Sequence, residues 1–320
     1  MLNRRILRIK AFKIIYSYAV TGGKNLDDIL KGLDKSCEAT RDLWLFLLAI
    51  IPPVTEEAKR RIEARKGKFN PTEEDLNPNM KFAQNKVAGI LADDPDFKKV
   101  LSRKNLSWDQ YDVIVRSVYS SFSARKCFAD YMADPETSLK ADCDLFIKMF
   151  EKEFIGKPQI DELLEDINID WMSDDLEYAI HWVIFTLRDL SEGKRWNMVP
   201  LYQSDVTRLR NPGTNVSSDR DFVRKICGQA YSGYQRYFKE ISEAVPDWDS
   251  DRLFSMDMAI LALALAEAES VPDIPLKVTV NEWVEISKFF CSEKSPAFIN
   301  GLLDTMIQKE IADGKIKKNF

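Results

Sequence analysis

The segment at residues 251–270, DRLFSMDMAILALALAEAES, constrains the fold more than any other part of the sequence. Alanine and leucine are strong helix formers, so the segment predicts a helix whose surface packs tightly against neighbouring helices. The turn that follows, VPDIP, cannot continue the helix because proline lacks the required N–H group. The longest apolar runs, residues 43–51 and 258–266, are each roughly half of the ~20 residues needed to cross a bilayer, so neither is expected to be a membrane span.

Two further helices are expected after this segment. The sequence LKVTVNEWVEISKFF places Thr279 and Glu282 at the spacing of a capping box. In KSPAFINGLLD, Ser295 is expected to be the N-cap and Pro296 to occupy the first helical position. Gly301 lies inside this last helix, at a cost of about 1 kcal/mol relative to alanine. We expect the close approach of another helix to explain that glycine.

The first helix of the chain carries an excess of positive charge. Apolar side chains recur at helical spacing over residues 4–20, and Gly22 and Gly23 are expected to end the helix. No acidic residue precedes Asp27, whereas the helix carries Arg4, Arg5, Arg8, Lys10 and Lys13. The three arginines fall within one arc of about 100° beside the core stripe, so all three could contact one phosphate backbone. A solvated positive face is the alternative interpretation.

The composition favours an all-α fold. Glycine (12) and proline (13) are scarce among 320 residues, and 45% of the residues are hydrophobic, which favours long helices over a turn-rich sheet protein. Further helices are expected at about residues 42–51, 108–132, 142–154 and 219–244. The first of these is expected to stop before Pro52 and Pro53. A polar loop is expected at residues 66–82, and turn residues at 198–218 indicate a domain boundary.

A weak internal repeat relates two parts of the chain. Trp171 matches Trp248, and several residues around each tryptophan, within 142–176 and 219–253, match at the same offset of 77. The pattern suggests a duplicated unit of helix, loop and capped helix in which the tryptophan anchors the loop. Chance similarity between helix caps is the alternative.

Charge and composition also limit the kinds of function. The net charge of -5 means that any nucleic-acid site must be local, because phosphate binding needs positive potential. His181 is the only histidine, which excludes a cluster of histidine metal ligands, and neither GxxxxGKS/T nor GxGxxG occurs. Five widely spaced cysteines fit neither a disulfide framework nor a CxxC site, and no signal peptide is expected. We therefore expect a cytoplasmic, non-enzymatic protein without a metal or cofactor.

Two regions of the sequence resemble one known family. The C-terminal pattern is IPxKVxxNExxExxK followed by KSxxFxNGxLD, carried here by Pro275, Lys277, Val278, Asn281, Glu282, Glu285, Lys288, Lys294, Ser295, Phe298, Asn300, Gly301 and Asp304. The opening RRxLRxKAxxxxY, which ends at Tyr16, resembles the arginine-rich first helix of the same family. In both regions the chain resembles NusB proteins.

The resemblance implies a two-lobed helical bundle that binds the single-stranded boxA element of nascent ribosomal RNA transcripts. NusB proteins do this with Nus factor E, which is also a small-subunit ribosomal protein, in an RNA polymerase complex that resists termination. By resemblance, the RNA-binding positions are Arg4, Arg5, Arg8 and Phe298, and the partner-binding positions are Tyr16 and Asp257. Lys294 stands where some relatives have an acidic residue, and we expect it to add a phosphate contact.

The resemblance also divides the chain into three parts. Residues 1–25 form the first helix of the NusB-like core, residues 201–320 form its C-terminal part, and residues 26–200 form a helical insertion, interpreted as an extension or a partial duplication. Two other functions fit the sequence. One is a helical scaffold or adaptor without RNA binding. The other is an RNA-binding module related to that of ribosomal RNA cytosine methyltransferases, although no glycine-rich strand-to-helix turn is found.

Overall fold

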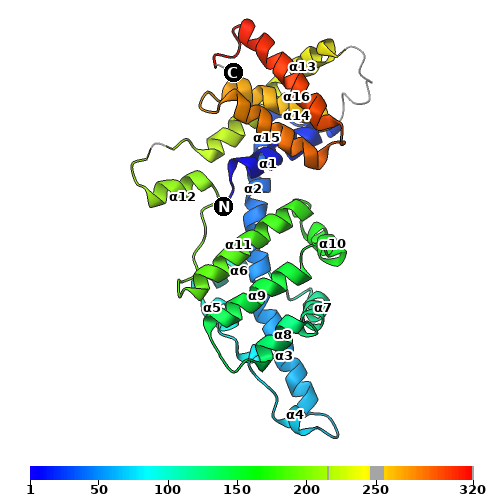
Figure 1. Cartoon of the computed structure of the whole chain (residues 1–320), viewed down its shortest axis with the longest axis vertical. Helices are drawn as coiled ribbons and strands as arrows, with labels where there is room; N and C mark the ends of the chain where they lie inside the picture. The colour runs from blue at the N-terminus through cyan, green and yellow to red at the C-terminus, as the bar shows by residue number, and fades with distance from the viewer. Residues whose placement is uncertain (215, 246–255, 319–320) are drawn as a thin grey trace. The chain divides into compact units, whose positions relative to one another are not determined.

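The computed structural model describes residues 1–214, 216–245 and 256–318. Throughout these residues the regular secondary structure is helical, which confirms the predicted all-α fold. The chain divides into two compact units, whose helices are labelled in Figure 1. Unit 1 consists of Met1–Cys37 and Pro200–Phe320, and unit 2 of Glu38–Val199.

Unit 1 is built around α14 (Met256–Ser270), a helix that is buried on all sides. Every side chain from Asp257 to Ala268 is buried, as predicted for the segment rich in alanine and leucine. The helices that contact α14 in Figure 1 are α1 (Arg4–Thr21), α13 (Asp219–Ala244), α15 (Leu276–Phe290) and α16 (Ser295–Ala312). The short α12 (Gln203–Arg210) and the beginning of α2 (Leu26–Leu48) complete the unit.

Unit 2 packs its helices around a cluster of aromatic side chains. The ring centroid of Phe46 lies 4.3 Å from that of Trp108 and 5.2 Å from that of Trp171. The Trp108 indole N–H donates to the Phe46 carbonyl oxygen at 2.6 Å, which satisfies its polar group inside the core. After α2, the helices are α3 (Ile51–Lys66), α4 (Glu73–Leu76), η1 (Phe82–Gln84), α5 (Lys86–Asp93), α6 (Pro95–Lys104), α7 (Asp112–Ser123), α8 (Lys126–Ala133), α9 (Leu139–Glu153), α10 (Pro158–Ile167) and α11 (Ser173–Ser191).

Several helix boundaries differ from the predictions. α2 begins at Leu26, well before the expected start at residue 42. α2 ends at Leu48, before Pro52 and Pro53, as predicted; the start of a new helix, α3, at these prolines was not predicted. Proline is tolerated in the first turn of a helix, where its missing N–H has no intrahelical partner. The end of α1 agrees with the prediction, since Gly22 follows its last residue with φ +64.

Two segments expected to be irregular contain short helices. The predicted loop at residues 66–82 includes α4, and the turn-rich segment at 198–218 includes α12. The helix expected at 108–132 is instead the pair α7 and α8. In each case the helix is short, so its apolar positions are too few to produce a clear periodic signal.

The division between the units falls inside α2, between Cys37 and Glu38. From the sequence, the insertion was expected to begin after residue 25 and to end at residue 200. In the structure, unit 2 begins at Glu38 and ends at Val199. A continuous helix carries no turn signal at such a boundary, so sequence patterns point to the nearest interruption instead.

Part of the predicted repeat lies outside the described residues. Trp248 and its neighbours fall within 246–255, as does the expected start of α14 at residue 251. In the first copy, Trp171 is buried and its indole N–H donates to the Ala39 carbonyl oxygen at 2.8 Å. No helix in the described ranges has the length and apolar character needed to cross a membrane.

Candidate nucleic-acid interface

The start of α1 is held by its cap and by the residues that precede it. The side chain of Asn3 accepts a hydrogen bond from the Ile6 N–H at 3.0 Å, so Asn3 is the N-cap. The Leu2 N–H donates to the Leu201 carbonyl oxygen at 2.6 Å, and the Gln203 N–H donates to the Leu2 carbonyl oxygen at 3.0 Å. These contacts fix the position from which the α1 arginines extend.

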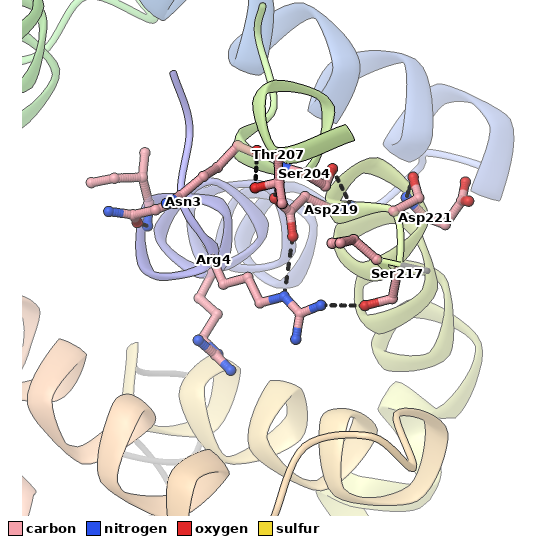
Figure 2. Close-up of polar contacts among 12 residues, drawn as sticks. Asn3, Arg4, Ser204, Thr207, Ser217, Asp219 and Asp221 are labelled. Carbon is pink, nitrogen blue, oxygen red and sulfur yellow. Dashed lines mark hydrogen bonds and ion pairs between the residues drawn. The ribbon is translucent and has the colours of Figure 1, made fainter. Parts of the chain in front are cut away.

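Arg4 connects α1 to the start of α13 (Figure 2). Its Nε donates to Asp219 Oδ1 at 3.1 Å, and its Nη2 donates to Ser217 Oγ at 2.5 Å. Asp219 is itself held by Ser204, whose backbone N–H donates to Oδ2 at 2.8 Å. The Arg4 guanidinium also lies over the ring of Phe222, 5.1 Å from its centroid. About a third of the Arg4 side chain remains exposed. Arg4 therefore holds α1 against α13 and still presents part of its guanidinium group at the surface.

Arg5 forms a bidentate ion pair with Glu282 on α15. Its Nε and Nη2 donate to the two carboxylate oxygens at 2.9 and 2.8 Å. The hydrogen bond from Arg5 lowers the pKa of Glu282, so the carboxylate is ionised at neutral pH. The Arg5 side chain is 48% exposed and has further N–H groups beyond those that Glu282 accepts. Arg5 is therefore held in a fixed orientation and is the most accessible of the three arginines.

Arg8 is buried in the core of unit 1. Its side chain is 3% exposed, and its Nε and Nη2 donate to the two oxygens of Glu267 at 2.8 and 2.7 Å. Glu267, fully buried on α14, also accepts from Thr279 Oγ1 at 2.9 Å and from Trp283 Nε1 at 3.0 Å. The prediction that all three arginines contact one phosphate backbone is wrong for Arg8. Its guanidinium group is enclosed by α1, α14 and α15, and the Glu267 carboxylate neutralises its charge.

The same network explains why the predicted capping box is wrong. α15 begins at Leu276, so Thr279 lies inside the helix and its hydroxyl donates to Glu267 instead of capping. Glu282 is likewise engaged by Arg5. Buried polar groups are hydrogen-bonded, and a fully buried carboxylate takes the available donors from both neighbouring helices.

The predicted N-cap at Ser295 is also wrong. Lys294 occupies the N-cap position of α16 without a side-chain capping bond, and Ser295 is the first helical residue. The Ser295 hydroxyl donates to the buried carboxylate of Asp257 at 2.9 Å. The Ser295 hydroxyl is therefore engaged by a buried carboxylate, and its backbone N–H donates to the Ser292 carbonyl oxygen at 2.9 Å.

Lys294 and Phe298 both lie at the start of α16. The Lys294 side chain is exposed, and Phe298 is half-buried. Residues four apart lie on the same face of a helix, so the cation and the aromatic ring are neighbours there. The position of Phe298 is intermediate between a core residue and a surface residue.

Tyr16 and Asp257, the two residues expected to bind a partner, line one open pocket of about 230 Å³ in unit 1. Phe290 and Cys291 form another part of its wall. Tyr16 stacks on the ring of Phe12 at 6.0 Å, which fixes its orientation. Burial, together with a hydrogen bond to Asp257, raises the pKa of the Cys291 thiol, so the thiol is protonated at neutral pH.

The sequence profile of the NusB family matches residues 201–308. The transcription antitermination protein NusB of Thermoanaerobacter sp. (strain X514) is 30% identical over 142 residues, which cover 98% of that protein and 40% of this chain. The chain belongs to the NusB family. The NusB protein of Clostridium kluyveri is 33% identical over 131 residues, covering 78% of that protein and 41% of this chain. No solved structure gives a significant match.

Membership of the NusB family assigns less than half of the chain. The profile lies within unit 1, so unit 2 falls outside it. In the described residues no three histidine, cysteine, aspartate or glutamate side chains gather as a metal site requires. All five cysteines are free thiols.

The acidic partners of the arginines were not predicted from the sequence. Asp219 on α13 pairs with Arg4, Glu267 on α14 pairs with Arg8, and Glu282 on α15 pairs with Arg5 and also lies 3.6 Å from Arg8. One signal was available: Glu267 is an acidic residue near the end of an otherwise apolar segment, and a buried carboxylate requires a cationic or hydrogen-bonding partner.

Proposed function

We propose that this NusB-family chain is a non-enzymatic transcription antitermination factor that binds boxA-like single-stranded RNA. It does so in the cytoplasm together with a small-subunit ribosomal protein, Nus factor E, as part of an RNA polymerase complex. The observation that carries the proposal is the half-exposed Arg5, which Glu282 holds in place on the arginine-rich helix of a NusB-family core.

The RNA contacts divide among residues of different exposure. Arg5 and the exposed part of Arg4 supply guanidinium groups that neutralise phosphates, and Lys294 adds a further cation. Phe298 supplies part of an aromatic ring, and stacking of a base on such a ring is worth about 1–3 kcal/mol. Arg8 acts indirectly, because its pair with Glu267 fixes α1 against α14 and α15 and thereby positions Arg5.

The ribosomal protein binds at the pocket of Tyr16 and Asp257 in this proposal. A tyrosine beside a carboxylate offers both an apolar surface and a hydrogen-bond acceptor to a protein partner. With the partner bound there, the RNA would contact surfaces of both proteins.

The test is a gel-shift titration of boxA-like RNA against a scrambled RNA of equal length, with and without the ribosomal protein. The proposal expects tighter binding of the boxA-like sequence and a further gain in affinity when the partner is present. Equal affinity for both RNAs in the presence of the partner would contradict it.

A further inference from the structure

Unit 2 contains a pocket of about 660 Å³ that lies outside the NusB-like core. It is formed by the second half of α3, η1, α7 and α8, and α4 packs against α3 nearby (Figure 1). The volume is within the range of about 300–1,000 Å³ that is typical of ligand pockets. The proposed antitermination function assigns no role to this pocket.

The floor of the pocket is apolar. Ile62, Phe82, Tyr119 and Phe128 line it, and each is less than a tenth exposed. The ring of Phe82 lies 5.1 Å from that of Phe128 and 5.8 Å from that of Tyr119, so the rings pack against one another. A large apolar side chain that enters the pocket would be removed from water on most of its surface.

The charged residues of the pocket are all cationic: Arg61, Arg65 and Lys68. Arg61 is paired with Glu57 at 2.7 Å, and Lys68 with Asp75 at 3.0 Å.

Arg65 is exposed, and in the described residues it has no carboxylate within ion-pair distance. Arg61 and Arg65 both line the pocket, and the Arg61 guanidinium lies 4.9 Å from the centroid of the Tyr119 ring. The rim therefore presents uncompensated positive charge beside the apolar floor.

Two large, exposed apolar side chains directly follow Lys68 and Asp75, which form an ion pair at this rim. Phe69, which follows Lys68, is 98% exposed, and Leu76 at the end of α4 is 55% exposed. The turn that presents them is ordered by a capping box, in which Thr72 and Asp75 exchange hydrogen bonds. Exposed apolar side chains grouped beside a pocket and a charged rim are typical of protein-binding surfaces.

We propose that this pocket docks an acidic segment of a protein partner through one large apolar anchor residue. The anchor fills the pocket above Phe82 and Phe128, flanking carboxylates contact Arg65 and its neighbours, and Phe69 and Leu76 extend the contact. Single-stranded RNA fits less well, because stacking needs an accessible ring face. The floor rings cover one another, and the Arg61 guanidinium already lies over Tyr119, 4.9 Å from its centroid.

In the experiment, peptides of about twelve residues are selected from a random display library for binding to the whole chain. Each selected peptide is then titrated by fluorescence anisotropy against three variants. Arg65→Glu reverses the uncompensated rim charge, Ala64→Trp fills the pocket from an exposed position on its wall, and Lys99→Glu makes the same charge change at an exposed site on α6. Melting temperatures verify that the variants are folded.

The proposal expects enriched peptides with a tryptophan, phenylalanine or leucine flanked by aspartate or glutamate. Their affinity should fall by about tenfold or more with Arg65→Glu and with Ala64→Trp, and change by less than about twofold with Lys99→Glu. Enrichment without acidic residues, or equal binding to all variants, would overturn the proposal. Weaker binding of boxA-like RNA to Arg65→Glu, with unchanged peptide binding, would also overturn it and indicate an RNA surface.

Discussion

Arg8 and Glu267 form a bidentate ion pair in which both side chains are buried, with N–O distances of 2.7 and 2.8 Å. The two residues are 259 positions apart in the sequence, so the pair joins the first helix, α1, to α14, the central helix of unit 1. Thr279 and Trp283 complete the carboxylate's hydrogen bonds from a third helix. The arginine-rich first helix thus has a structural role as well as a proposed RNA-binding role.

Arg8→Ala should destabilise the protein far more than Arg5→Ala. Removing Arg8 leaves the buried Glu267 carboxylate without its cation, and breaking a buried pair in this way costs about 3–5 kcal/mol. Arg5 is half-exposed, so its loss should cost no more than about 1 kcal/mol. Denaturant unfolding of both variants measures the difference.

A double variant provides the control for this comparison. Arg8→Met with Glu267→Gln removes both charges. The Gln amide oxygen can still accept from the Trp283 N–H, and its NH2 group can donate to the Thr279 hydroxyl, so part of the lost stability should return. A full loss of stability in the double variant would show that packing, and not the unpaired charge, determines the effect.

Arg5→Ala should weaken RNA binding and reduce its dependence on salt. Loss of one phosphate contact lowers the slope of log K against log salt concentration by about 0.7 for single-stranded RNA. Lys239→Ala, at an exposed site on α13, is the matched control and should leave the slope unchanged. An unaltered slope in Arg5→Ala would mean that Arg5 serves only its pair with Glu282.

Tyr16→Ala should reduce affinity for the ribosomal protein without changing affinity for RNA alone. The substitution removes one wall of the pocket that contains Asp257, and a buried interface tyrosine typically contributes about 2 kcal/mol or more. Calorimetric titration with the partner measures the effect. Val278→Ala, at an exposed position on α15, should bind the partner normally.

Glu310 should make the stability of the protein depend on pH. Its carboxyl is buried on α16 near Glu269 and Glu240, and the nearby cations are Arg236 and Lys315. Burial, and then the charge of Glu269, raises the pKa of Glu310 to about 8. The unfolded value is about 4.3. Between these pH values the folded state keeps a proton that the unfolded state releases, so this group lowers the free energy of unfolding as pH rises.

Glu310→Gln cannot ionise and should therefore gain stability over the natural chain as pH rises from about 4.3 to 8. The difference should be near zero at the lower limit and, at about 1.4 kcal/mol per pH unit, should approach about 5 kcal/mol above the upper one. Glu243→Gln, at an exposed site, should show no such trend in thermal unfolding. A constant difference at every pH would refute the assignment.

Gly301→Ala should stabilise the protein by about 1 kcal/mol. The expectation that another helix approaches this glycine closely is wrong, because an added Cβ would meet nothing within 4 Å. Gly233→Ala is the opposite case, since its Cβ would lie 2.7 Å from the Tyr237 ring, and that variant should lose stability. Thermal unfolding compares them. Destabilisation by Gly301→Ala would reveal a constraint on the backbone of α16.

Local signals in the sequence were sufficient for the long helices of the NusB-like core, though not for the short α12. The apolar spacing of α1, the glycine after it and the composition of α14 each act over a few residues, and the structure agrees with them. The proline pair at Pro52 and Pro53 was ambiguous, because the same residues that end one helix can begin the next.

The sequence by itself determined the all-α fold, the family and the placement of positive charge on the first helix. Only the tertiary structure decided which of those charges remain accessible: Arg8 is buried, Arg4 is partly used, and Arg5 is half-exposed. The reason is that an ion pair depends on which distant carboxylate the fold brings within about 4 Å. Periodicity and composition describe one helix at a time and contain no information about that distance.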